Sequence, residues 1–138
     1  MNHIEKTEIE KMLDMAQEAM GHAYSVYSNF QVGACLKAKS GKYYLGCNIE
    51  NAAFSPTICA ERTAMVKAVF EGERDFEAIA IICSGENPSY PCGVCRQVLS
   101  EFCDGEMPVV SANCRREYTV YALSELLPCA FGPKDLNK

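Results

Sequence analysis

Apolar residues recur along the first third of the chain with two different periods. Over residues 4–20 they return every three or four positions until Gly21, which predicts an amphipathic helix. The segments 30–38 and 43–49 read as strands, and the short turn KSGK between them is typical of an antiparallel hairpin. The chain therefore begins with a helix followed by a hairpin.

The rest of the chain alternates helical and extended patterns. Residues 59–72 return to helical spacing, and residues 77–83 form a continuous apolar run, as expected of a strand buried on both faces. Further expected elements are a helix over 93–103, strands over 107–113 and 118–122, and a short helix over 123–128. This order predicts one α/β domain over residues 1–138, a three-layer α/β/α arrangement with a mixed five-stranded sheet.

Composition and charge exclude several classes of protein. The 138 residues are 49% hydrophobic and 22% charged, as in soluble globular domains. The net charge of −5 offers no basic face, so we expect no nucleic-acid partner. No apolar run is long enough to span a membrane, and the charged N-terminus lacks the apolar core of a signal peptide. We therefore expect a cytoplasmic protein with no membrane partner.

Nine cysteines are the unusual feature of the composition. An odd number in a chain without a secretion signal argues for reduced thiols rather than a disulfide framework. Four of them fall within predicted strands or helices and are expected to be small buried hydrophobes: Cys35, Cys47, Cys83 and Cys103. Any metal-binding or catalytic cysteine is therefore expected among the remaining ones.

Three of the remaining cysteines lie where predicted helices begin. Cys59 and Glu61 fall in the first turn of one helix, where free N–H groups and the helix dipole favour a thiolate and a carboxylate. Cys92 and Cys95 form a C-x₂-C pair at the start of another. Such a pair can bind metal or serve redox chemistry of the thioredoxin type, although that motif is expected after the first strand of a βαβ unit. Cys59 and Glu61 could also be a buried cysteine and an ordinary first-turn acid.

The ligand count favours a catalytic rather than a structural zinc site. A structural site needs four protein ligands, but there is no second C-x₂-C, and His3 and His22 are expected to be exposed or capping residues. Cys59, Cys92 and Cys95 would leave the fourth tetrahedral position to water. Glu61 would then be the acid–base partner of that water.

Five segments of the chain, in order, resemble those of the zinc-dependent cytidine deaminases in their short, three-cysteine form: FQVGA, GCNIENAAFS, CAERTA, PCGVCRQV and ELLPCAFGPKDL. The resemblance implies the cytidine deaminase-like fold and Zn²⁺ bound by the three cysteines. It also implies hydrolytic deamination of cytidine and deoxycytidine to uridine and deoxyuridine plus ammonia, in pyrimidine nucleoside salvage.

The resemblance also assigns roles near the metal and the sugar. Glu61 would move the protons, and Arg62 would hydrogen-bond the ligand sulfurs and withdraw charge from them. Asn48 and Glu50 would bind the ribose 3′-hydroxyl, and a carboxylate there should disfavour a phosphorylated substrate. Taken alone, Arg62 reads as a surface helix cation, and Asn48 and Glu50 as turn residues.

The remaining roles concern the base and the assembly. Phe30 would pack against the pyrimidine, and the N–H of Ala60 would meet the base carbonyl. Phe131 would reach the active site of a neighbouring subunit in a homotetramer; the alternative is that it packs on its own domain. Two other functions stay open: a blasticidin S deaminase, whose counterpart of Glu50 is not a glutamate, and a non-catalytic zinc module, which would not need Glu61.

Overall fold

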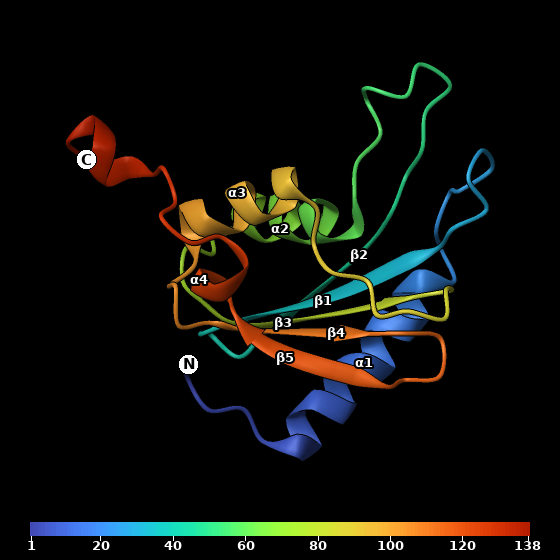
Figure 1. Ribbon diagram of the computed structural model, residues 1–138, viewed down its shortest axis with the longest axis horizontal. Coiled ribbons are helices and arrows are strands. Elements are labelled where there is room, and N and C mark those ends of the chain that lie inside the picture. Colours follow the sequence, from blue (N-terminus) through green and yellow to red (C-terminus); the bar gives the residue numbers. More distant parts are fainter.

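A mixed five-stranded sheet forms the centre of the computed structural model, which describes all 138 residues (Figure 1). Its strands lie in the order β2-β1-β3-β4-β5, with β3 and β4 parallel and the other neighbours antiparallel. The strands are β1 (Val32–Ala38), β2 (Tyr43–Cys47), β3 (Phe76–Cys83), β4 (Pro108–Ala112) and β5 (Tyr118–Ala122). The helices are α1 (Lys6–Met20), α2 (Ala60–Phe70), α3 (Gly93–Phe102) and α4 (Leu123–Leu126), with a final 3₁₀ turn, η1 (Pro133–Leu136).

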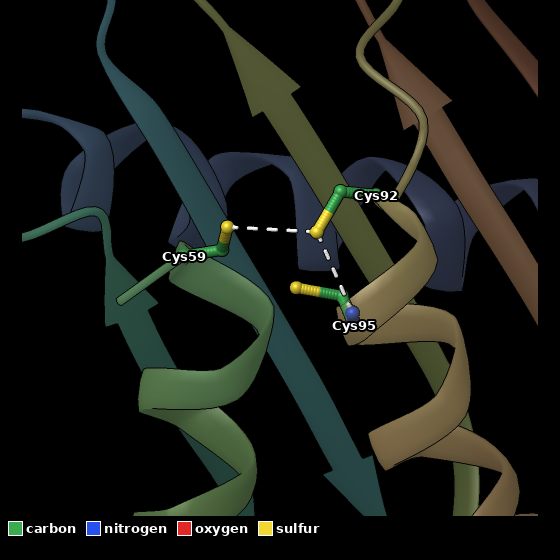
Figure 2. A group of neighbouring side chains, drawn as sticks. All are labelled: Cys59, Cys92 and Cys95. Carbon is green, nitrogen blue, oxygen red and sulfur yellow. Dashed lines mark hydrogen bonds between the residues drawn. The ribbon is translucent and has the colours of Figure 1, made fainter. Parts of the chain in front are cut away.

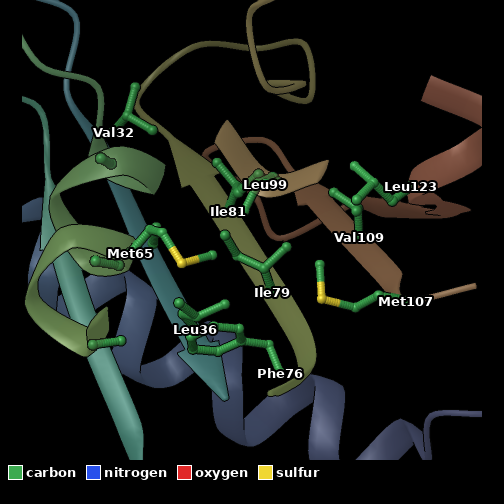
Figure 3. Close-up of a cluster of buried hydrophobic side chains, with 14 of the residues drawn as sticks. Val32, Leu36, Met65, Phe76, Ile79, Ile81, Leu99, Met107, Val109 and Leu123 are labelled. Atoms are coloured by element: carbon green, nitrogen blue, oxygen red, sulfur yellow. The ribbon is translucent and has the colours of Figure 1, made fainter. Parts of the chain in front are cut away.

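Helices cover both faces of the sheet. In Figure 1, α1 lies on one face, and α2 and α3 lie on the other. The apolar run of β3 shows why: Ile79 and Ile81 belong to the core under α2 and α3 (Figure 3), whereas Ala80 and Ile82 belong to the core under α1. Alternate residues of one strand thus enter two separate cores, which requires an unbroken apolar sequence. The predicted three-layer α/β fold is confirmed.

Two glycines allow the helices to approach the sheet closely. A Cβ on Gly33 would come within 1.9 Å of the carbonyl oxygen of Ala16 in α1. A Cβ on Gly46 would come within 2.2 Å of the carbonyl oxygen of Ala60, in the first turn of α2. Any side chain at Gly46 would therefore push away the end of α2 that carries Cys59 and Glu61.

The predicted elements are all present; most are shorter than the sequence indicated, but β5 has its predicted bounds and β3 begins one residue earlier, at Phe76. Cys103, expected within the third helix, instead ends it as the C-cap residue, and η1 was not predicted within the tail. Cys35 and Cys83 are buried as expected, while Cys47 and Cys103 are half-buried. No helix combines the length and apolar character that crossing a membrane requires.

Candidate metal centre

The first part of the site is the start of α2. Cys59 is its N-cap residue, in extended conformation, and Ala60 and Glu61 are its first two helical residues. An antiparallel bridge between Ile49 and Ile58 closes the preceding loop, which fixes where the helix begins. Ala60 is completely buried, and as the first helical residue its N–H has no partner within α2. The contact of this N–H with the base carbonyl stays a prediction.

The second part is the start of α3, which follows β3 through the loop 84–92. Cys92 is the N-cap residue, and its sulfur accepts a hydrogen bond from the backbone N–H of Cys95, 3.5 Å away. Arg96 fixes the same loop, because its Nε donates to the carbonyl oxygen of Pro91 over 2.6 Å. The C-x₂-C spacing therefore places both sulfurs at one helix end.

The two helix starts bring three sulfurs together (Figure 2). The Sγ atoms of Cys59, Cys92 and Cys95 all lie within 4.8 Å of one another, and those of Cys59 and Cys92 are 3.8 Å apart. Tetrahedral zinc with Zn–S bonds of about 2.3 Å requires sulfurs about 3.8 Å apart. The cluster therefore fits a zinc ion. It contains neither a fourth sulfur nor a histidine, as an open catalytic site requires.

Arg62 supplies positive charge to the cluster. Its Nη2 donates to the sulfur of Cys59 over 3.4 Å. The pKa of the Cys59 thiol is lowered, chiefly by a hydrogen bond from Cys95 and further by Arg62. Three thiolates would exceed the charge of a divalent cation by one, and a guanidinium hydrogen-bonded to one of the sulfurs is suited to offset that excess. The interpretation of Arg62 as a free surface cation is wrong.

Glu61 is a buried carboxylate beside the sulfurs. Only 4% of the residue is exposed. Burial raises its pKa to about 7, and the neighbouring Cys59 adds to the increase. An acid that titrates near neutrality can both accept and return a proton. Glu61 does lie in the first turn of α2, but its burial and raised pKa are not those of an ordinary first-turn acid.

The residues expected to bind the sugar and the base form one hydrogen-bonded group. The side chain of Asn48 bridges Phe30 and Val32: its Nδ2 donates to the Phe30 carbonyl (2.7 Å), and its Oδ1 accepts from the Val32 N–H (2.9 Å). Glu50 accepts from the backbone N–H groups of Tyr27 and Ser28. Asn48 retains a second N–H and a second lone pair for a ligand. Phe30 itself is 41% exposed and free to contact one.

Phe131 lies apart from these residues, on the C-terminal tail. It is 60% exposed, and its carbonyl oxygen accepts a hydrogen bond from Nε2 of Gln97 on α3 (2.9 Å). The tail extends outward beyond α3 and α4 (Figure 1). The alternative that Phe131 packs into its own domain is therefore wrong.

Comparison with known proteins decides between a redox site and a zinc enzyme. The family model described as "Cytidine and deoxycytidylate deaminase zinc-binding region" matches residues 6–111, which include all three cysteines. The chain belongs to this family. Its metal is therefore zinc, and a thioredoxin-type redox function is excluded.

Individual members of the deaminase family match nearly the whole chain. A cytidine deaminase of Sporosarcina psychrophila is 48% identical over 94% of this chain and 96% of its own, and one of Halalkalibacterium halodurans is 44% identical over 93% and 97%. A crystal structure of cytidine deaminase from Burkholderia pseudomallei, 40% identical, superposes with a TM-score of 0.86 over 95% of this chain and all of its own. The chain is thus a zinc-dependent deaminase with the cytidine deaminase fold.

Proposed function

We propose that this deaminase converts cytidine and deoxycytidine, with water, to uridine and deoxyuridine plus ammonia. The observation that carries the proposal is the buried Glu61 beside a three-sulfur cluster, in a chain whose relatives are named cytidine deaminases. We assign Cys59, Cys92 and Cys95 as the zinc ligands. The whole chain, residues 1–138, would serve as a single catalytic unit in pyrimidine nucleoside salvage in the cytoplasm.

The metal and the carboxylate have separate tasks. Cys59, Cys92 and Cys95 would hold the zinc, which when bound would lower the pKa of water and so favour a hydroxide nucleophile for C4 of the base. Glu61 accepts a proton from the attacking water and passes it to N3 of the ring; it then takes the remaining proton of the new C4 hydroxyl and gives it to the departing ammonia, as that oxygen becomes the carbonyl of the product. Burial suits Glu61 to this exchange, because in the zinc-free protein it raises the pKa to about 7 and so lets the carboxyl group hold a proton that an exposed glutamate would lose.

The polar residues near Phe30 would select a nucleoside. Asn48 and Glu50 bind the sugar hydroxyls, Phe30 covers the pyrimidine, and the free N–H of Ala60 meets the base carbonyl. The pKa of Glu50 is lowered, chiefly by the Ser28 hydroxyl, so its carboxylate is ionised at neutral pH. A substrate phosphate would be repelled by this charge, which disfavours nucleotides.

We also propose that four chains assemble and share active sites. Phe131 is exposed on the tail, where a neighbouring chain could use it to cover a base. A groove between α2 and α3 is lined entirely by apolar side chains, and Phe70 at its edge is 87% exposed. Both features leave apolar surface that association would bury.

The loss of ultraviolet absorbance on deamination tests the substrate assignment. Cytidine, deoxycytidine, cytosine, cytidine monophosphate and blasticidin S are compared, with and without a chelator that removes zinc. We expect turnover of the two nucleosides only, abolished by the chelator and restored by added zinc. Comparable turnover of the monophosphate, or of blasticidin S in place of cytidine, would overturn the assignment.

A further inference from the structure

Ser28 connects two residues that the proposed function places against the substrate. Its hydroxyl donates to Oε2 of Glu50 and accepts from the backbone N–H of Phe30, 3.0 Å away. The backbone N–H of Ser28 also donates to Oε1 of Glu50, over 3.1 Å. Ser28 thus joins the carboxylate expected to bind the sugar to the backbone of the residue expected to pack against the base.

Phe30 is held on its other sides as well. Its carbonyl oxygen accepts from Asn48, and the next residue, Gln31, donates its N–H to Oγ of Ser84 over 3.0 Å. Its ring lies against Gly85, where a Cβ would come within 3.1 Å of Cε1. The N–H of Phe30 has the Ser28 hydroxyl as its acceptor, and that hydroxyl is itself held by Glu50. A change at Ser28 should therefore affect both Phe30 and Glu50.

We propose that Ser28 is a positioning residue that sets Phe30 and Glu50 relative to each other before substrate binds. The proposal rests on the proposed function, since it takes sugar and base as the ligands of these two residues. A hydrogen bond to an ionised carboxylate is stronger than one between neutral groups, so Ser28 restrains Glu50 effectively. Because these contacts are made in the ground state and persist in the transition state, losing them should raise KM more than it lowers kcat.

The chain contains a matched control at the opposite end of β1. The hydroxyl of Ser40 donates to Oε2 of Glu73 over 2.7 Å and accepts from the N–H of Lys42, two residues later, at 3.4 Å. Ser28 has the same pattern: a glutamate distant in sequence, and the N–H two residues ahead. Ser40→Ala therefore removes the same type of interaction, far from the sulfur cluster.

Steady-state kinetics with cytidine on the zinc-loaded protein test the proposal. For Ser28→Ala we expect KM to rise by at least about 10-fold, the lower end for losing a hydrogen bond to a charged group. We expect kcat within about 3-fold of wild type, one zinc per chain, and a melting temperature close to that of Ser40→Ala. Ser28→Thr, which keeps the hydroxyl, should recover most of the loss. An unchanged KM in Ser28→Ala, or equal kinetic effects in Ser40→Ala, would overturn the proposal.

A double-mutant cycle separates positioning from general loosening. In a Glu50→Ala background, Ser28→Ala should raise KM by less than half the factor that it produces alone, because the partner of its hydroxyl is gone. Effects that multiply independently would contradict the coupling. Failure of the proposed function would look different: the wild-type protein itself would not deaminate cytidine.

Discussion

The burial of Glu61 should make the zinc-free protein less stable at neutral pH, and Glu61→Gln should remove that cost. Glu61 is 4% exposed, and its pKa rises from 4.5 to about 7 on folding, chiefly through burial. Between these values the folded state keeps a proton that the unfolded state has lost. The free energy of unfolding therefore falls as pH rises through this window, and the full cost is present above pH 7.

The magnitude follows from the shift. An increase of about 2.5 pKa units, at about 1.36 kcal/mol per unit, corresponds to about 3 kcal/mol. Glutamine has nearly the same shape and no titration. The stability of Glu61→Gln relative to wild type should therefore increase by up to about 3 kcal/mol between pH 4.5 and pH 8. Titrations of groups distant from Glu61 cancel in this difference.

Urea unfolding, followed by far-ultraviolet circular dichroism at a series of pH values, measures this difference. Circular dichroism is used because the chain has no tryptophan. A chelator removes zinc from both proteins, and reducing conditions keep the free thiols from oxidising. Glu71→Gln, at an exposed acid just after the same helix, serves as the control for replacing a carboxylate by an amide. A difference between Glu61→Gln and wild type that stays constant with pH, or that shrinks as pH rises, would refute the reasoning.

Two further predictions concern the placement of the site and its assembly. Gly46→Ala should destabilise the protein by about 2–3 kcal/mol and weaken zinc binding, because the added Cβ would meet the backbone of Ala60. Thermal unfolding measures the stability, and competition with a zinc chelator measures the affinity for zinc. Gly132→Ala, which has open space around it, is the control and should change neither. Phe131→Ala should raise KM for cytidine while zinc content stays at one per chain, and light scattering showing a fully active monomer would contradict the shared site.

The metal site could be predicted because its determinants are local. Cys59 and the Cys92–Cys95 pair each lie at a helix start, and helical periodicity reveals where a helix starts. The ligand count then separated a catalytic site from a structural one. Residue spacing alone does not predict that the two helix starts meet. They meet because α2 and α3 pack side by side on one face of the sheet.

Other features depend on contacts between distant parts of the chain. The position of β1 between β2 and β3, and the parallel pairing of β3 with β4, join segments that local patterns do not relate. The role of Ser28 could not be predicted from its neighbours in sequence, because its partner Glu50 is 22 positions away. A hydroxyl two residues before an exposed aromatic was the only local signal, and it is a weak one.

The turnover of cytidine by zinc-loaded Glu61→Gln tests the central claim most directly. Glutamine keeps the shape of the side chain but cannot transfer protons, so we expect one zinc per chain and a kcat at least about 100-fold below wild type. Cys92→Ala, assayed in parallel, should lose zinc and activity together. A Glu61→Gln protein that holds zinc and deaminates cytidine within a few-fold of the wild-type rate would contradict the account.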